Sequence, residues 1–285
     1  IEKEKALPYF ESALKNSKQD TIPEILYYIG RSKHYKGDFD GAIVAYNSFK
    51  SYLSRNRGNA LILLQDVNRY LVMCRHSKAF ADNPKAGIQV ENLGAAINSK
   101  FPDYAPVIKD DESVLLFTSR RTGSTGGEIY FDQKFFEDIY FTVFKAGEWS
   151  KASNLDPSNE VMNSTINTPF HEAAINYNGD ETKLFIYRQN GIWRSDLGVE
   201  GWLPPVDMGD EINTKKFQET HVFISNDGRS MFVVSDRKEG LGGRDIFYTN
   251  RLPNGKWSDL KNLGPNINTA FDEDAPFISP DGSTL

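Results

Sequence analysis

The chain has 285 residues, enough for about two domains, and its 39% hydrophobic and 13% aromatic content can fill real cores. Its 33 basic and 39 acidic residues give a net charge of -6 without any Lys/Arg-rich run, which argues against a protein that binds nucleic-acid backbones. No window approaches the roughly 18 uninterrupted apolar residues of a membrane-spanning helix, and the single cysteine, Cys74, excludes an internal disulfide framework and a Cys-based zinc cluster.

Up to about residue 83, apolar residues follow helical spacing in segments that fit a repeat of about 34 residues. In "PEILYYIGRSKHYKGDFDGAIVAYNSF", the small residues Gly30 and Ala42 would let two antiparallel helices approach closely, while Tyr46 fills the space between repeats. A further helix is predicted over roughly 59–81. Within it, "RYLVMCRHSKAF" indicates that Cys74 is a small buried residue rather than a reactive thiol.

This helical spacing resembles the tetratricopeptide (TPR) repeat. The template positions fall on Leu26, Ile29, Gly30, Gly37, Ala42 and Tyr46. The sequence departs from the template at Lys33, Phe49 and Ser54. The resemblance implies a TPR-like solenoid, and because such arrays are stable only as a stack, we expect further repeats upstream.

The character of the chain changes after "ADNPKAGIQ", where Asn83 and Pro84 end the helical part. Runs such as "SVLLFTS", "KLFIYR" and "SMFVVSD" are then rich in β-formers and bounded by turn residues. We therefore expect TPR-like helical repeats at 1–83, a linker at 84–91 and a β domain at 92–285.

One sequence unit occurs four times in the β part. Each copy opens with Ile-Asn and Ser or Thr, continues with an aromatic residue and then an acid, and reaches a second acid in a predicted hairpin. The openings are Ile97-Asn98, Ile166-Asn167, Ile212-Asn213 and Ile267-Asn268. The first acids are Asp103, Glu172, Glu219 and Glu273, and the hairpin acids are Asp111, Asp180, Asp227 and Asp281. A unit of about 45 to 55 residues with short strands and fixed turns is typical of a β-propeller blade.

Over 92–285, the motifs of this unit resemble those of the WD-like, TolB-type propeller repeat. The motifs are "L-G-x-x-I-N-[ST]", "S-x-D-G", "S-x-R", "G-G-x-D-I-[YF]" and "G-x-W". The expected fold is therefore α+β and multidomain: a TPR-like α-helical solenoid followed by an all-β propeller of four-stranded blades, about three and a half of them in this chain. Since propellers close rings of about four to eight blades, we expect the native polypeptide to be longer.

The order of these modules resembles the amino-terminal part of envelope proteins that join TPR, a TolB-like propeller and an OmpA-like peptidoglycan-binding domain. Some of these belong to type IX secretion and gliding machinery, and the Gly-rich, aromatic insertion at 120–140 fits that group. The resemblance implies a periplasmic, outer-membrane-associated protein without cofactors. Envelope proteins would bind the TPR groove and propeller face, and peptidoglycan would bind a domain outside this chain.

The four first acids are the candidate ligand-binding residues. Asp103, Glu172, Glu219 and Glu273 could ring a central channel and bind a cation or a polar ligand. The favoured alternative is that a group repeated in every blade stabilises the fold. It would accept hydrogen bonds from the next blade's backbone or pair with an arginine such as Arg121 or Arg237. The hairpin acids are explained by their turns.

Other chemistry has less support in the sequence. His171 and His221 flank the repeated acids and could face the same channel, but a zinc site needs a third ligand that the pattern does not supply. The acidic run at 272–274 lacks the spacing of a calcium loop. No nucleophile elbow, Walker loop or H-E-x-x-H motif occurs.

The sequence therefore predicts a non-enzymatic scaffold that mediates protein–protein interactions. Two alternatives stay open. The propeller binds a carbohydrate or an ion, or it is a glycan-cleaving enzyme in which Glu172, Glu219 and Glu273 supply the acid and the base.

Overall fold

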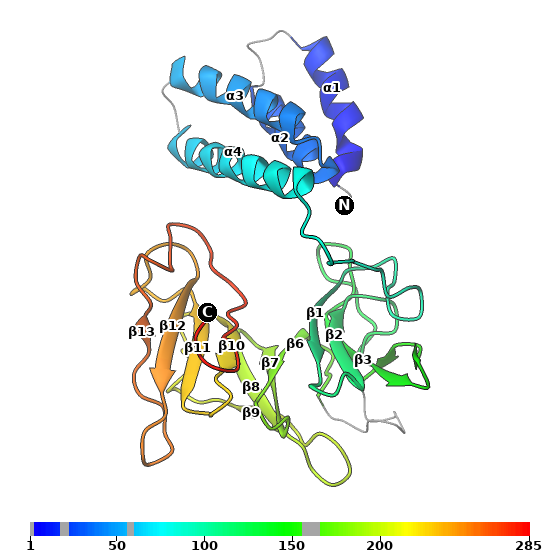
Figure 1. The fold of residues 1–285 in the computed structure, drawn as a ribbon, viewed down its shortest axis with the longest axis vertical. Helices are drawn as coiled ribbons and strands as arrows, with labels where there is room; N and C mark the ends of the chain where they lie inside the picture. Colours follow the sequence, from blue (N-terminus) through cyan, green and yellow to red (C-terminus); the bar gives the residue numbers. More distant parts are fainter. Residues whose placement is uncertain (1–2, 18–22, 56–59, 156–165) are drawn as a thin grey trace. The chain divides into compact units, whose positions relative to one another are not determined.

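The computed structural model describes residues 3–17, 23–55, 60–155 and 166–285. The chain forms two compact units, residues 1–91 and 92–285, and each is described by itself. In Figure 1 the first unit is helical and the second is built of β-sheets.

The helical unit contains four α-helices in its described part, preceded by a short 3-10 turn, η1 (Lys3–Ala6). The helices are α1 (Leu7–Asn16), α2 (Glu24–Lys36), α3 (Phe39–Arg55) and α4 (Ala60–Asp82). Helix α2 ends at Gly37, whose φ of 82° is a left-handed conformation that glycine adopts without strain. Asp38 then caps α3, because its carboxylate accepts the N–H of Gly41 at 2.9 Å.

The core of this unit depends on a close approach between α2 and α3. A Cβ atom added at Gly30 would lie 2.6 Å from the ring of Tyr46, so only glycine fits at this crossing. Ala42, Tyr46 and Phe49 are fully buried beside it. Cys74 on α4 is also fully buried, and burial raises the pKa of its thiol to about 11. The helix predicted over roughly 59–81 is confirmed as α4, and the predicted burial of Cys74 is confirmed too.

In its described part, the β unit contains three antiparallel sheets, each built by consecutive strands. The first blade contains β1 (Asp103–Ile108), β2 (Val114–Ser119), β3 (Asp138–Lys145), β4 (Glu148–Trp149) and β5 (Ser153–Asn154); β4 and β5 both pair with β3. The second contains β6 (Glu172–Tyr177), β7 (Lys183–Arg188), β8 (Gly191–Asp196) and β9 (Val206–Asp207). The third contains β10 (Glu219–Ile224), β11 (Ser230–Ser235), β12 (Asp245–Asn250) and β13 (Lys261–Asn262). Successive antiparallel sheets of four or five strands make this part propeller-like, as predicted.

The blades are joined by apolar cores on both faces. Leu116 and Ile139 of the first blade pack in one cluster with Leu184 and Ile186 of the second. Phe185 and Ile192, on the opposite face of the second blade, pack in another cluster with residues of the third, among them Val222, Met231 and Val233. Burial on both faces explains why the middle strands read as continuous apolar runs rather than as alternating patterns.

The hairpin acids lie in tight turns between the first two strands of a unit. Asp111, Asp180, Asp227 and Asp281 each accept the backbone N–H of the residue two positions later, at 2.9 to 3.0 Å. The residue between has a positive φ, as at Gly228 (68°) and Gly282 (72°). The predicted turn role of these acids is confirmed. In the part of the chain that the structure describes, no helix is long and apolar enough to cross a bilayer.

Candidate functional site

Asp103, Glu172 and Glu219 begin the first strands of their sheets, whereas Glu273 lies outside the described strands; the carboxylates of all four bond within their own units. Asp103 accepts hydrogen bonds from the backbone N–H of Ser99 (2.6 Å), the hydroxyl of Ser119 (2.6 Å) and the guanidinium of Arg121 (2.7 Å). The same arginine donates to the carbonyl of Ile97 at 2.8 Å. The side chain thus ties the opening Ile-Asn of the unit to its first and second strands.

The third blade repeats this arrangement. Glu219, which is fully buried, accepts from the N–H of Thr214 (3.0 Å), the hydroxyl of Ser235 (2.9 Å) and Arg237 (2.8 Å). Arg237 also donates to the carbonyl of Ile212 at 3.2 Å. We call this arrangement of acid, hydroxyl residue, arginine and Ile carbonyl the acid clamp.

The second blade forms the acid clamp with a shifted arginine. Arg188 stands in register with Glu172, at the position that serine holds in the other two blades. Its guanidinium donates to Glu172 at 3.1 Å and to the carbonyl of Ile166, and the N–H of Thr168 donates to Glu172 at 3.0 Å. Glu273, in the fourth copy, accepts the N–H of Thr269 at 2.9 Å.

The stabilising role expected for the four repeated acids differs from the structure in one respect. The arginine pairing expected for Arg121 and Arg237 is present, but the backbone donors come from the same unit rather than from the next blade. Burial raises the pKa of Glu172 above its ordinary value, although hydrogen bonds from Thr168 oppose this effect. Burial also acts to raise the pKa of Asp103, but its hydrogen bonds from Ser119, Arg121 and Ser99 outweigh that effect and leave the pKa lowered.

Contacts between blades depend on the asparagine of the Ile-Asn opening, which the sequence indicated only as the start of each unit. Asn167 of the opening Ile-Asn accepts the backbone N–H of Ile139 in the preceding blade at 2.9 Å and donates to the carbonyl of the same residue at 2.8 Å. Asn213 pairs with Ile192, and Asn268 with Ile246, in the same two-point way. The recurrence of Ile-Asn in every unit is the sequence feature that could have indicated this role, since a side-chain amide can pair with one backbone N–H and one C=O.

A cavity of about 950 Å³ lies along the innermost strands of the β unit. Its lining includes small apolar residues, among them Ala105, Ala173, Ala174 and Ala275. Among the four repeated acids, Glu172 borders the cavity, although the residue is fully buried. Asp103, Glu219 and Glu273 do not line it, and the walls are formed instead by their sequence neighbours. Ligand binding by the four acids stays a prediction.

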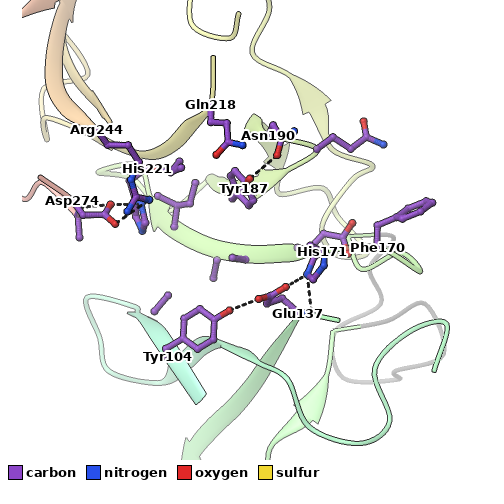
Figure 2. Close-up of a pocket in the computed structure, with 18 of the residues that line it drawn as sticks. Tyr104, Glu137, Phe170, His171, Tyr187, Asn190, Gln218, His221, Arg244 and Asp274 are labelled. Carbon is purple, nitrogen blue, oxygen red and sulfur yellow. Dashed lines mark hydrogen bonds and ion pairs between the residues drawn. The ribbon is translucent and has the colours of Figure 1, made fainter. Parts of the chain in front are cut away.

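Two polar clusters stand on opposite sides of this cavity (Figure 2). In one, the hydroxyl of Tyr104 donates to Glu137 at 2.9 Å, and the other carboxylate oxygen of Glu137 contacts Nδ1 of His171. In the other, Nδ1 of His221 lies 2.6 Å from Asp274.

Arg244 completes the second cluster, with its guanidinium 3.7 Å from Asp274. Burial acts to raise the pKa of Asp274, but the hydrogen bond from His221 and the charge of Arg244 outweigh it and hold the pKa below its ordinary value. Arg244 also pairs with Asp272 at 3.4 Å.

A third side of the cavity carries neutral polar groups. Tyr187 donates its hydroxyl to the side chain of Asn190 at 3.0 Å, and Gln218 lies nearby on the same side in Figure 2. None of these residues stood out in the sequence. Positions facing the cavity differ from unit to unit, so they leave no repeated pattern.

His171 and His221 both line the cavity, as the sequence suggested, but each faces its own carboxylate. Among residues 3–17, 23–55, 60–155 and 166–285, no group of three or more His, Cys, Asp or Glu side chains is arranged to hold a metal ion. The acidic run at 272–274 is engaged with Arg244, Thr269 and His221.

No protein-family model matches the sequence, and no curated protein matches it. Among solved structures, a periplasmic gluconolactonase of Pseudomonas aeruginosa is 13% identical, with a TM-score of 0.34 over 62% of this chain and 48% of its own. A candidate TolB of Agrobacterium tumefaciens is 15% identical, with a TM-score of 0.36 over 64% of this chain and 56% of its own. A candidate 6-phosphogluconolactonase of Bacteroides uniformis is 12% identical, with a TM-score of 0.34 over 64% and 46%. This chain therefore spans about half the length of these structures.

Proposed function

We propose that this protein is a non-enzymatic scaffold of the bacterial cell envelope, located in the periplasm and associated with the outer membrane. Its helical unit would act as a TPR-like groove for a peptide or helix of one partner, and its propeller-like unit would offer a rigid face to another. In this role it links a secretion or motility complex to peptidoglycan, through a domain outside this chain.

The observation that carries the proposal is the use of the repeated acids. The carboxylates of Asp103, Glu172 and Glu219 accept hydrogen bonds from their own blades and pair with arginine. A general acid or base must be able to reach its substrate, and a nucleophilic carboxylate must be exposed to it. These side chains serve the fold, which favours a binding role over catalysis by the repeated acids.

Two features support the assignment of partner-binding surfaces. The contact of Gly30 with Tyr46 allows the close approach of helices on which stacked helical repeats depend. Large hydrophobic side chains are exposed on both units, including Tyr35 at 49% and Phe170 at 60%. Exposed apolar and aromatic side chains of this kind could contribute to surfaces that bind other proteins.

The test is capture of partners by the tagged chain from cross-linked envelope fractions, followed by mass spectrometry. We expect a reproducible set of envelope proteins, part of which is lost when Tyr35 on α2 is replaced by serine. The matched control is Asn47→Ser on α3, an exposed polar residue, which should keep the full set. Recovery of no protein beyond those bound by an unrelated tagged protein would overturn the scaffold function.

An enzymatic role is the second candidate, favoured by the two His–carboxylate pairs in the cavity. An imidazole oriented by a carboxylate is a common general base. The distinguishing assay measures turnover of glycosides, esters and lactones by the wild-type chain and by His221→Ala. The scaffold proposal expects no turnover, whereas turnover that the substitution abolishes would establish the enzyme.

A further inference from the structure

The cavity of the β unit has the chemistry of a ligand site that the repeated acids do not account for. Its volume of about 950 Å³ is at the upper end of the range of small-molecule sites. Its lining includes small apolar side chains, and labelled polar groups lie on three sides of it (Figure 2). This combination of an apolar surface with a few placed polar groups is what small-molecule sites require.

Backbone conformation singles out one side of this cavity. Strands β7 and β8 are joined by a two-residue turn, Gln189-Asn190, with φ values of 52° and 65°. Two positive φ values belong to a type I′ turn, for which Asn-Gly is the favoured sequence and glutamine is unfavourable. Glutamine at this position lowers the stability of the turn, yet Gln189 and Asn190 both line the cavity. Strain kept at such a position points to a binding role.

Positive φ values also occur at other residues that line the cavity. The structure gives positive φ to eight residues other than glycine within the described ranges. Four of them line the cavity: Ala105, Gln189, Asn190 and Ala275. The alanines, each with a φ of 49°, stand at matching places in the first and fourth units, two residues after the repeated acid.

The charges at the wall are compensated within the protein. Glu137 contacts His171 and lies 3.6 Å from Arg120, and Asp274 contacts His221. Arg244 already pairs with two aspartates. An anionic or cationic ligand would therefore have to replace existing pairs and meet the cost of desolvating its own charge.

The remaining groups favour a ligand made of hydroxyls. The side-chain amides of Gln189, Asn190 and Gln218 each both donate and accept, as a sugar hydroxyl does. The rings of Tyr104 and Tyr187 add flat apolar surface. We propose that this cavity binds a neutral, polyhydroxylated ligand of the size of one to three sugar units, held by the Gln189-Asn190 turn and Gln218 on one side and by the tyrosines.

Calorimetry with the full chain tests this site. The probes are glucose, N-acetylglucosamine, cellotriose, chitotriose, glucuronic acid and end-blocked tetra-alanine. We expect at least one neutral saccharide to bind more tightly than glucuronic acid and the peptide. Tighter binding of a trisaccharide than of its monomer would identify a glycan chain as the source of the ligand, and equal binding would identify a free sugar; both support the site.

Variants locate the binding. Gln218→Ala removes an exposed side chain and should weaken the affinity about tenfold, the effect of one well-placed hydrogen bond. Gln65→Ala, an exposed glutamine on α4, is the matched control and should bind like the wild type. Gln189→Gly relieves the turn, so it should keep or raise the melting temperature while it weakens binding.

Three results would overturn the inference. These are no binding of any neutral saccharide, preference for tetra-alanine or glucuronic acid, and equal affinity of the wild type and Gln218→Ala. The scaffold function is tested separately by partner capture, so either proposal can fail without the other.

Discussion

Asn167 joins two blades by pairing its side-chain amide with both backbone groups of Ile139, at 2.9 Å and 2.8 Å. The asparagine is 5% exposed and the isoleucine is fully buried, so water cannot replace these hydrogen bonds. The asparagine of the Ile-Asn motif thus acts between blades, whereas the acid clamp acts within one.

Replacement of Asn167 by alanine should therefore destabilise the β unit. It takes the asparagine acceptor from the buried N–H of Ile139, which costs about 1 to 3 kcal/mol, whereas the C=O of Ile139 still accepts the N–H of Leu155 at 3.0 Å. We expect the free energy of unfolding in urea to fall by about 1 to 3 kcal/mol. Asn226→Ala, at an exposed hairpin position, is the control and should change it by less than about 0.5 kcal/mol. Equal effects of the two substitutions would contradict the inter-blade role.

The acid clamp predicts strong coupling between Glu219 and Arg237. Arg237→Met leaves a fully buried carboxylate without its cation, which costs about 3 to 5 kcal/mol. The double variant Glu219→Gln/Arg237→Met removes the charge as well and should recover part of this loss. A double-mutant cycle on urea unfolding measures the coupling, and additive effects would show that the pair is energetically independent.

Asp103 should contribute to acid denaturation. Its folded-state pKa is lowered by the hydrogen bonds of the acid clamp, so the folded protein holds the charged form more tightly than the unfolded chain does. The resulting stability is fully present above the unfolded-state pKa of about 3.9 and is lost as pH falls through the folded-state pKa. Asp103→Asn should be less stable than the wild type at pH 6, with a difference that shrinks below about pH 4. A constant difference between pH 6 and pH 2.5 would contradict this role.

Gly30→Ala tests the crossing of α2 and α3. Alanine favours a helix by about 1 kcal/mol over glycine, but its Cβ would lie 2.6 Å from the ring of Tyr46. Overpacking costs about 1 to 3 kcal/mol, so we expect net destabilisation of the helical unit in thermal unfolding. The double variant Gly30→Ala/Tyr46→Leu removes the colliding ring and should be more stable relative to Tyr46→Leu alone. If Gly30→Ala stabilises the wild type, the close approach is wrong.

Features that repeat in the sequence were predictable, and features that vary were not. The hairpin acids and the start of each unit could be located because every copy solves the same turn and packing problem. The cavity side chains occupy equivalent positions but differ in type, as Tyr104, Ala173, Thr220 and Asp274 do directly after the repeated acids. These side chains lie together at the cavity because of how the strands pair, and strand pairing cannot be detected from the pattern of single residues.

The sequence also did not predict which way the repeated carboxylates point. Side chains of a regular strand alternate between its two sides, but the register shifts near the start of β1, β6 and β10. In the second blade, Glu172 and Ala173 both border the cavity, which regular alternation does not predict.

The most direct test of the account compares Glu219→Gln with His221→Gln by the free energy of unfolding in urea. Glu219 is fully buried in the acid clamp, and His221 lines the cavity two residues later. We predict a loss of at least about 2 kcal/mol for Glu219→Gln and of less than about 1 kcal/mol for His221→Gln, whose pair with Asp274 is partly exposed. A small loss at Glu219 together with a large loss at His221 would contradict the claim that the repeated acids maintain the fold while their neighbours form the binding site.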